Sequence, residues 1–151
     1  MLKTEEPSKR MERFNDLCNT VAERYPIVQT KQQVNAIACC IYFYETLCKG
    51  FDKLVTLDIT SELPIGAGLG SSASFNVCLV TAMLVLSGSI PHAYKFIPEH
   101  LQLINKWAFV GEQFLHGNPS GIDNSVATFG NAVAMHKHNN QVVLENVQKY
   151  C

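Results

Sequence analysis

Apolar residues recur every three to four positions in four stretches of the chain, and this spacing predicts α-helices. The helices are expected at residues 9–25, 30–49, 72–88 and 99–116. Pro26 ends the first of them, and the Thr30 hydroxyl is placed to cap the second. The third is apolar on most faces, which predicts a buried helix.

Three shorter stretches have the β-branched or alternating pattern that predicts strands. They cover residues 53–61, 132–136 and 142–147. Pro64 ends the first strand, and residues 138–141 are expected to form a hairpin turn between the other two. The chain shows no internal repeat and no low-complexity segment, as is usual for an ordinary globular domain.

The composition excludes several classes of protein. The chain has 151 residues, of which 47% are hydrophobic, and a formal net charge of −1. Without an excess of positive charge, nucleic acid is not expected as the main partner. No membrane partner is expected either, because the longest apolar-rich run, residues 75–86, is too short to span a bilayer. The charged N-terminus lacks the pattern of a secretory signal.

The six cysteines favour a reducing, cytoplasmic location. Their irregular spacing, with Cys39 and Cys40 adjacent, fits neither a disulfide framework nor a zinc site. Four of them lie among apolar neighbours in predicted helices, where cysteine usually packs as a small hydrophobic residue.

A glycine-rich turn, GAGLGSS at residues 66–72, separates the first predicted strand from the apolar helix. A helix N-terminus offers unpaired N–H groups and the positive end of the helix dipole, and glycines let an anion approach the backbone closely. The turn has no lysine, which excludes a P-loop, and no acid follows about 20 residues on, which argues against a dinucleotide fingerprint. A simple corner between strand and helix is the alternative, but Ser71 and Ser72 at the helix start favour phosphate binding.

Asp123 is the one acidic residue in the turn-rich stretch at residues 117–130. Glycines and a proline restrict the backbone there, so the carboxylate could be held in one orientation and act as a general base. An aspartate that caps a short helix at residues 124–128 is the alternative, and the local sequence alone favours that alternative.

Glu112 lies near the C-terminal end of the fourth predicted helix, where the negative end of the helix dipole disfavours a carboxylate. A bound divalent cation would offset this, since such cations prefer carboxylate and hydroxyl oxygens. A solvent-facing glutamate is the commoner alternative. His116, at the end of the same helix, is interpreted as a structural residue because a protonated histidine suits a helix C-terminus.

Two motifs together resemble those of the GHMP kinases, and among them the mevalonate kinase branch. The sequence SELPIGAGLGSSAS at residues 61–74 resembles the second motif of the superfamily. The series KWA, GE and HGNPSGIDN within residues 106–124 resembles the mevalonate kinases in particular. The resemblance covers roughly residues 34–147.

The resemblance implies ATP- and Mg²⁺-dependent phosphorylation of the 5-hydroxyl of mevalonate, a step of isoprenoid and sterol biosynthesis. ATP and mevalonate are then the expected partners, with Mg²⁺ as the cofactor. Ser72 and Glu112 would bind Mg²⁺, and Asp123 would accept the proton of the attacking hydroxyl. The residues that would bind ATP and its phosphates are Ser61, Gly66, Ala67, Gly68, Leu69, Gly70, Ser71 and Ser72.

The resemblance also implies an α+β fold, in which an incomplete GHMP kinase N-terminal domain packs a mixed sheet on helices and the C-terminal domain is absent. Residues 1–29 are expected to form a helical segment without a motif, and residues 30–151 a partial ATP-binding domain. The family's first, lysine-bearing motif and its third, glycine-rich motif have no counterpart in this sequence. Without the early strands, residues 53–61 would lack partners at an exposed sheet edge, which favours aggregation.

Different functions therefore remain open at this stage. One is an active kinase. The others are a catalytically inactive fragment and a regulatory or interaction module, each retaining the nucleotide loop. A homodimer is also left open.

Overall fold

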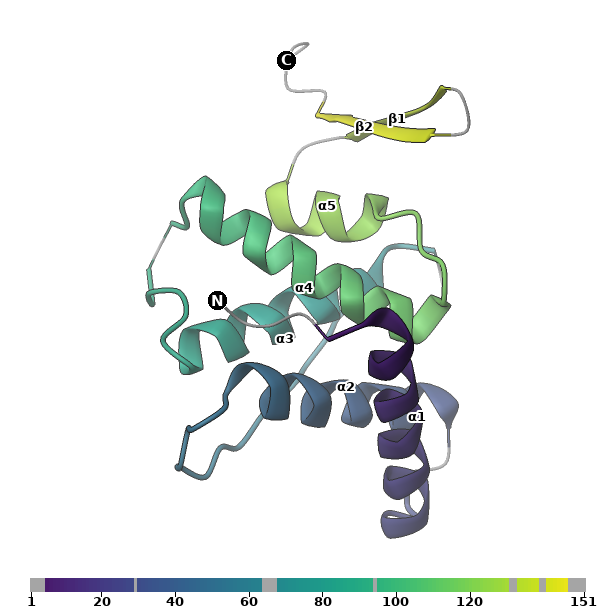
Figure 1. Ribbon diagram of the computed structural model, residues 1–151, viewed down its shortest axis with the longest axis vertical. Helices are drawn as coiled ribbons and strands as arrows, with labels where there is room; N and C mark the ends of the chain where they lie inside the picture. Colours follow the sequence, from purple (N-terminus) through teal and green to yellow (C-terminus); the bar gives the residue numbers. More distant parts are fainter. Residues whose placement is uncertain are drawn as a thin grey trace. The chain divides into compact units, whose positions relative to one another are not determined.

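The computed structural model describes residues 5–28, 30–63, 68–93, 95–130, 133–138 and 141–146 (Figure 1). The described helices and strands are α1 (Pro7–Arg24), α2 (Lys31–Leu47), α3 (Ser71–Leu86), α4 (Pro98–His116), α5 (Ile122–Phe129), β1 (Val133–His138) and β2 (Gln141–Asn146). The chain divides into two compact units. Unit 1 is Met1–Leu57 with Leu79–His92, and unit 2 is Asp58–Cys78 with Ala93–Cys151.

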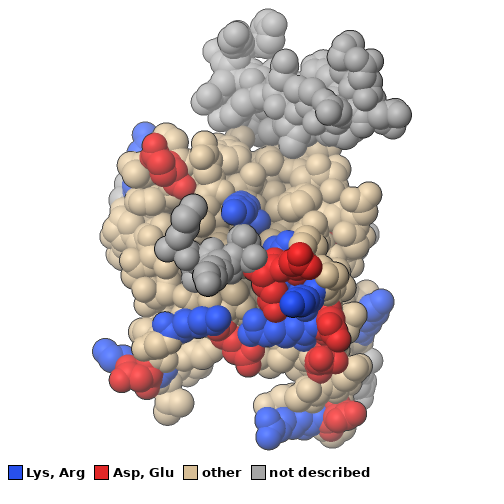
Figure 2. All heavy atoms as spheres, viewed as in Figure 1, with Lys and Arg blue, Asp and Glu red and all other residues tan. Residues whose placement is uncertain are grey.

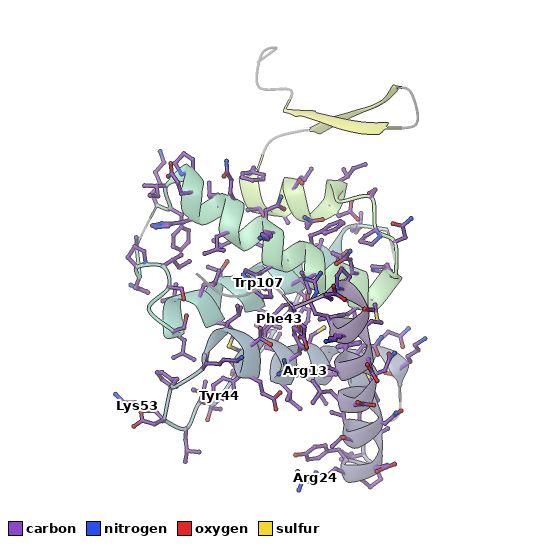
Figure 3. All side chains as sticks on the ribbon, viewed as in Figure 1. Arg13, Arg24, Phe43, Tyr44, Lys53 and Trp107 are labelled. Carbon is purple, nitrogen blue, oxygen red and sulfur yellow. The ribbon has the colours of Figure 1, made fainter. Side chains whose placement is uncertain are left out.

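In unit 1, α1 packs against α2 along one apolar stripe. Phe14 and Val21 on this stripe are buried, as the helical spacing predicted. Arg13 lies where the two helices meet (Figure 3). Its guanidinium is 2.7 Å from a carboxylate oxygen of Glu45 and 4.9 Å from the ring centre of Tyr42. The contact therefore combines apolar burial with an ion pair and a cation–π interaction.

The start of α2 is fixed by a capping box, which confirms Thr30 as the N-cap. The Thr30 hydroxyl accepts a hydrogen bond from the backbone N–H of Gln33 at 3.2 Å. The Gln33 side chain accepts one from the backbone N–H of Thr30 at 3.1 Å. Both N–H groups would otherwise lack a partner at this helix end.

The core of unit 1 lies between α2 and the C-terminal half of α3. Tyr42 and Phe43 are fully buried and their rings meet edge to face, with centroids 5.6 Å apart. Met83 and Leu84 of α3 are equally buried. The buried α3 that the sequence predicted is thus confirmed for this half of the helix.

The mixed sheet packed on helices is not seen in the described residues, and the expected fold class is wrong. These residues are mainly helical. Their one sheet is a two-stranded antiparallel hairpin, in which Val133 lies opposite Asn146 and His138 opposite Gln141. A mixed sheet needs parallel neighbours as well, and none occurs within the described ranges.

The strand predicted at residues 53–61 is also wrong. This segment has no regular secondary structure, and the side chains of Leu54, Leu57 and Ile59 are exposed. A strand is stable only where another strand pairs with its backbone, and the described part of the chain provides none here. The start of the segment is held instead by Tyr44, whose hydroxyl donates to the Lys53 carbonyl at 3.4 Å (Figure 3).

The described residues also show how charged side chains, apolar helices and thiols are distributed. Figure 2 shows described Lys and Arg side chains next to Asp and Glu side chains. None of the described helices has both the length and the apolar character needed to cross a membrane. The five cysteines in the described ranges are free thiols, and burial raises the pKa of Cys40 to about 11. Cys78, by contrast, is exposed.

Candidate functional site

The candidate phosphate site lies at the N-terminus of α3, in unit 2. Gly68 and Gly70 have φ of 71° and 68°, a left-handed conformation that favours glycine. The Gly70 carbonyl accepts the first helical hydrogen bond, from the Ser74 N–H at 2.9 Å. The N–H groups of Ser71 and Ser72 therefore have no partner within the helix, as an anion site requires.

The remaining predicted nucleotide residues are only partly described. Gly66 and Ala67 lie outside the described residues. Leu69 is exposed. Ser61 is exposed too, and its hydroxyl accepts a hydrogen bond from the N–H of Leu63 at 3.2 Å. No contact between Ser61 and the other predicted site residues is seen in the described part of the chain.

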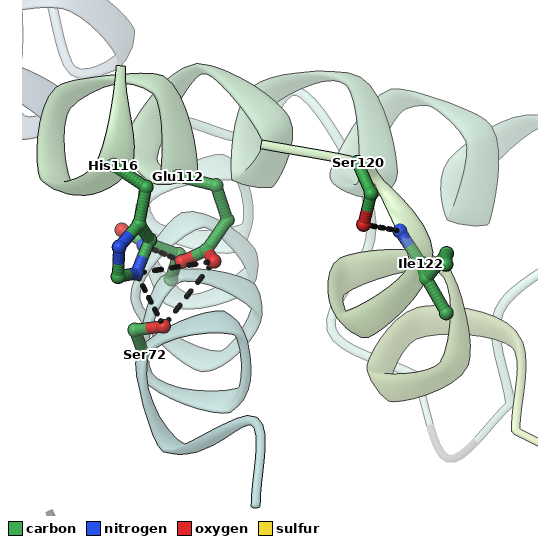
Figure 4. Close-up of polar contacts among 6 residues, drawn as sticks. Ser72, Glu112, His116, Ser120 and Ile122 are labelled. Carbon is green, nitrogen blue, oxygen red and sulfur yellow. Dashed lines mark hydrogen bonds and ion pairs between the residues drawn. The ribbon is translucent and has the colours of Figure 1, made fainter. Parts of the chain in front are cut away.

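The hydroxyl of Ser72 points toward Glu112 and His116 of α4 (Figure 4). It donates to Oε2 of Glu112 at 3.2 Å and lies 3.2 Å from Nε2 of His116. The Ser72 hydroxyl has a single proton, and it donates that proton in the hydrogen bond to Glu112. In the second contact His116 must therefore be the donor and Ser72 the acceptor. The two predicted cation ligands, Ser72 and Glu112, are thus brought together across 40 positions of sequence.

Glu112 is buried, with 3% of its surface exposed, so the solvent-facing alternative is wrong. Its Oε1 accepts a hydrogen bond from Nδ2 of Asn76 at 2.8 Å, and its Oε2 lies 3.8 Å from Nε2 of His116. A carboxylate in such a place needs charged or hydrogen-bonding neighbours, because an isolated buried charge is strongly destabilising.

Asp123 lies in the first turn of α5 and does not cap it, so the capping alternative is wrong. The N-cap is Gly121, with φ of 83°, and no side-chain hydrogen bond caps the helix. The Ser120 hydroxyl accepts from the N–H of Ile122 at 3.3 Å instead (Figure 4). The Asp123 carboxylate makes no hydrogen bond or ion pair with another described residue and is exposed. It is therefore free to act on a ligand.

Packing within unit 2 places Asp123 beside the glycine turn. A Cβ built on Gly70 would lie 3.7 Å from Cβ and 3.8 Å from Cγ of Asp123, which is van der Waals contact. Asn124, the next residue, is buried and donates to Oδ1 of Asn105 on α4 at 2.6 Å. This bond fixes α5 on α4 and with it the position of the acid.

The chemistry of the Ser72–Glu112 pair fits a divalent cation of the magnesium type. A carboxylate and a hydroxyl are hard oxygen ligands, and Mg²⁺ is usually bound by one or two protein oxygens with water and substrate phosphates. No group of three or more His, Cys, Asp or Glu side chains gathers in the described ranges. One carboxylate and one hydroxyl are a protein donor set of the size that Mg²⁺ commonly shares with a phosphate ligand.

Residues 35–131 match the family described as the GHMP kinases N terminal domain. The matched stretch includes the glycine-rich turn at residues 66–72, Glu112 and Asp123. The chain belongs to the GHMP kinase family.

Among curated proteins, this GHMP kinase chain is similar to mevalonate kinases. It is 49% identical to the Bos taurus protein over 107 residues, which are 65% of this chain and 27% of that protein. It is 47% identical to the Homo sapiens protein over 111 residues, 68% of this chain and 28% of that protein. Its identity to the Candida albicans protein is 45% over 112 residues, 68% of this chain and 26% of that protein. The chain spans about a quarter of the length of these relatives.

The side chains of Ser72, Asn76, Glu112 and His116 form a polar cluster, and Asn76 is the member that sequence reasoning missed. It stands in the otherwise apolar run at residues 75–86, and the apolar pattern alone assigns it no role. The available signal was its position four residues after Ser72, which places both on one face of α3. A polar residue that shares a face with a proposed ligand, inside an apolar helix, is expected to have a buried polar partner.

Proposed function

We propose that the chain supplies the phosphate turn, the cation ligands and the proton acceptor of an ATP-dependent kinase acting on the 5-hydroxyl of mevalonate. One observation carries the proposal: Asp123 lies against Gly70, two residues before the Ser72 that contacts Glu112. The family and the mevalonate kinase relatives support the choice of substrates.

In this proposal each group has a separate task. The N–H groups at the start of α3 bind phosphate oxygens, and Ser72 and Glu112 hold Mg²⁺. When bound, the cation would supply positive charge to the phosphates, as phosphoryl transfer requires. The mevalonate hydroxyl oxygen forms a bond to the γ-phosphorus while the bond from that phosphorus to the bridging oxygen of ADP breaks. Asp123 accepts the hydroxyl proton.

The proposed location is the cytoplasm. The free thiols of the described cysteines support a reducing compartment, because paired thiols are the rule in oxidising ones.

The test is phosphoryl transfer by the purified 151-residue chain with ATP, Mg²⁺ and mevalonate, followed by phosphorus NMR. Asp123→Asn keeps the shape of the side chain and removes its basicity. The rate of 5-phosphomevalonate formation is expected to fall by about 10² to 10⁴-fold, the usual contribution of a general base. Asp16→Asn, an exposed acid on α1, is the matched control and should leave the rate unchanged.

Equal rates for the native chain and Asp123→Asn would overturn the role of Asp123. The alternative left open by the sequence predicts a different result. A module that binds nucleotide without turnover would form no product in any version, yet would bind ATP with an affinity that Ser72→Ala lowers.

A further inference from the structure

The two carboxylate oxygens of Glu112 contact different neighbours. Oε1 accepts from Asn76, which is itself 0% exposed, and Oε2 lies against Ser72 and His116. One oxygen therefore faces the interior of unit 2, and the other faces the hydroxyl proposed to bind the cation. Ser72 is only half-buried, so the second oxygen lies on the more accessible side.

The orientation of the Asn76 amide follows from its partner. An ionised carboxylate can only accept hydrogen bonds, so the nitrogen of the amide, not its oxygen, must face Glu112. Oδ1 then points the other way, and it is buried without a hydrogen-bond partner among the described residues. A buried polar atom left unpaired indicates that the contact with Glu112 is maintained despite this cost.

Gly111 provides the space that this arrangement needs. A Cβ at position 111 would overlap Oδ1 and Cγ of Asn76 and would lie 3.0 Å from its Nδ2. The side chain of Asn76 thus lies flat against the backbone of α4, immediately before Glu112. A side chain at 111 would therefore require the amide of Asn76, the α4 backbone, or both to move.

We infer that Asn76 is a positioning residue, which holds Oε1 of Glu112 so that Oε2 is presented beside Ser72 as a cation ligand. The inference rests on the proposed function, because it takes Ser72 and Glu112 as the cation ligands. Neighbours that orient a metal ligand typically change metal affinity by 10- to 100-fold when removed. Asn76 would act through Glu112 and would not touch the cation.

Mn²⁺ binding, measured by electron paramagnetic resonance with a non-hydrolysable ATP analogue present, provides a readout that does not need turnover. Asn76→Leu has a similar shape and no donor, and it is expected to weaken Mn²⁺ binding by about 10- to 100-fold. Gly111→Ala should do the same from the α4 side, without any change to α3. Asn35→Leu makes the same chemical change on α2, where Asn35 accepts from Cys18, and should leave the affinity unchanged.

A second background separates positioning from general destabilisation. Glu112→Gln should weaken Mn²⁺ binding on its own, and adding Asn76→Leu to it should have no further effect. A native affinity in Asn76→Leu, or an equal loss in both backgrounds, would overturn the positioning role alone. If Glu112→Gln itself bound Mn²⁺ normally, the cation site of the proposed function would fail, and the positioning role with it. Circular dichroism of each variant identifies any that does not fold, and Gly111→Ala then replaces Asn76→Leu.

Discussion

Replacing Gly111 with alanine tests how closely α3 and α4 approach at the candidate site. The three atoms nearest to a Cβ at this position all belong to Asn76, and two of them would overlap it. Both residues are buried, so the added methyl group has no route to solvent. The strain must be relieved by moving the Asn76 amide, the α4 backbone, or both.

Two opposing effects determine the magnitude. Overpacking a buried site by one carbon costs about 1–3 kcal/mol. Alanine in a helix interior is about 1 kcal/mol more favourable than glycine. The free energy of unfolding of Gly111→Ala is therefore expected to fall by about 1 kcal/mol. In an Asn76→Ala background the overlap is gone, and only the higher helix propensity of alanine remains. Gly111→Ala should then raise the free energy of unfolding by about 1 kcal/mol.

Urea unfolding followed by circular dichroism at 222 nm measures all four proteins of this cycle. The expected coupling between positions 76 and 111 is about 2 kcal/mol, which is typical of residues in contact. Gln102→Ala, an exposed change on the same helix, provides the baseline for a substitution that displaces nothing. If Gly111→Ala were stabilising in both backgrounds, the close packing of Asn76 on α4 would be refuted.

Three further predictions concern other parts of the chain. Thr30→Ala removes the capping box and should lower the free energy of unfolding by about 1 kcal/mol, measured by the same urea titration. The pKa of Cys40 is about 11 against an ordinary 9.0, so its thiolate fraction at pH 8 is about 100-fold below that of an ordinary thiol. Iodoacetamide labelling followed by peptide mass spectrometry should therefore modify the exposed Cys78 before Cys40, and labelling of Cys40 should rise as the pH approaches 11. Ile59→Asp changes an exposed side chain and should reduce light scattering on standing while changing stability by less than about 0.5 kcal/mol. Scattering equal to that of the native chain would show that the exposed 53–63 segment does not drive association.

Local patterns predicted the helices well, because each helix makes its backbone hydrogen bonds within itself. The spacing of apolar residues located α1 to α4 to within a few residues, and Thr30 identified the start of α2 correctly. The hairpin of β1 and β2 also forms, since its two strands are neighbours in sequence. In each case the information needed lies within a short window.

The strand expected at residues 53–61 failed for the opposite reason. Its β-branched residues make a strand favourable only where another strand pairs with it, and the pattern cannot supply that partner. The same limit applies to the mixed sheet, which the resemblance implied rather than the residues. A sheet is a property of several segments, so a suitable sequence in one of them is not sufficient.

The prediction of site residues was limited by a third factor, which is the packing of helices that lie far apart in the sequence. Local rules favoured a solvent-facing Glu112 and a capping Asp123, and both alternatives proved wrong. What decides these residues is the approach of α3 to α4, and of α5 to the glycine turn. Asn76 was missed on the same ground, since its hydrogen bond to Glu112 spans 36 positions.

In unit 2, two of the three proposed functional groups lie at a helix end whose partial charge suits them. The glycine-rich turn lies at the positive N-terminus of α3, and Asp123 lies in the first turn of α5, where the helix dipole favours an acidic residue. Glu112 is the exception, because a carboxylate in the last turns of α4 meets the negative end of that helix. The field that disfavours Glu112 alone would favour a cation bound to it. Asn76, Ser72 and His116 already contact this carboxylate, and a bound cation would add positive charge at the same end of α4, which is the physical reason for proposing a cation at Ser72 and Glu112.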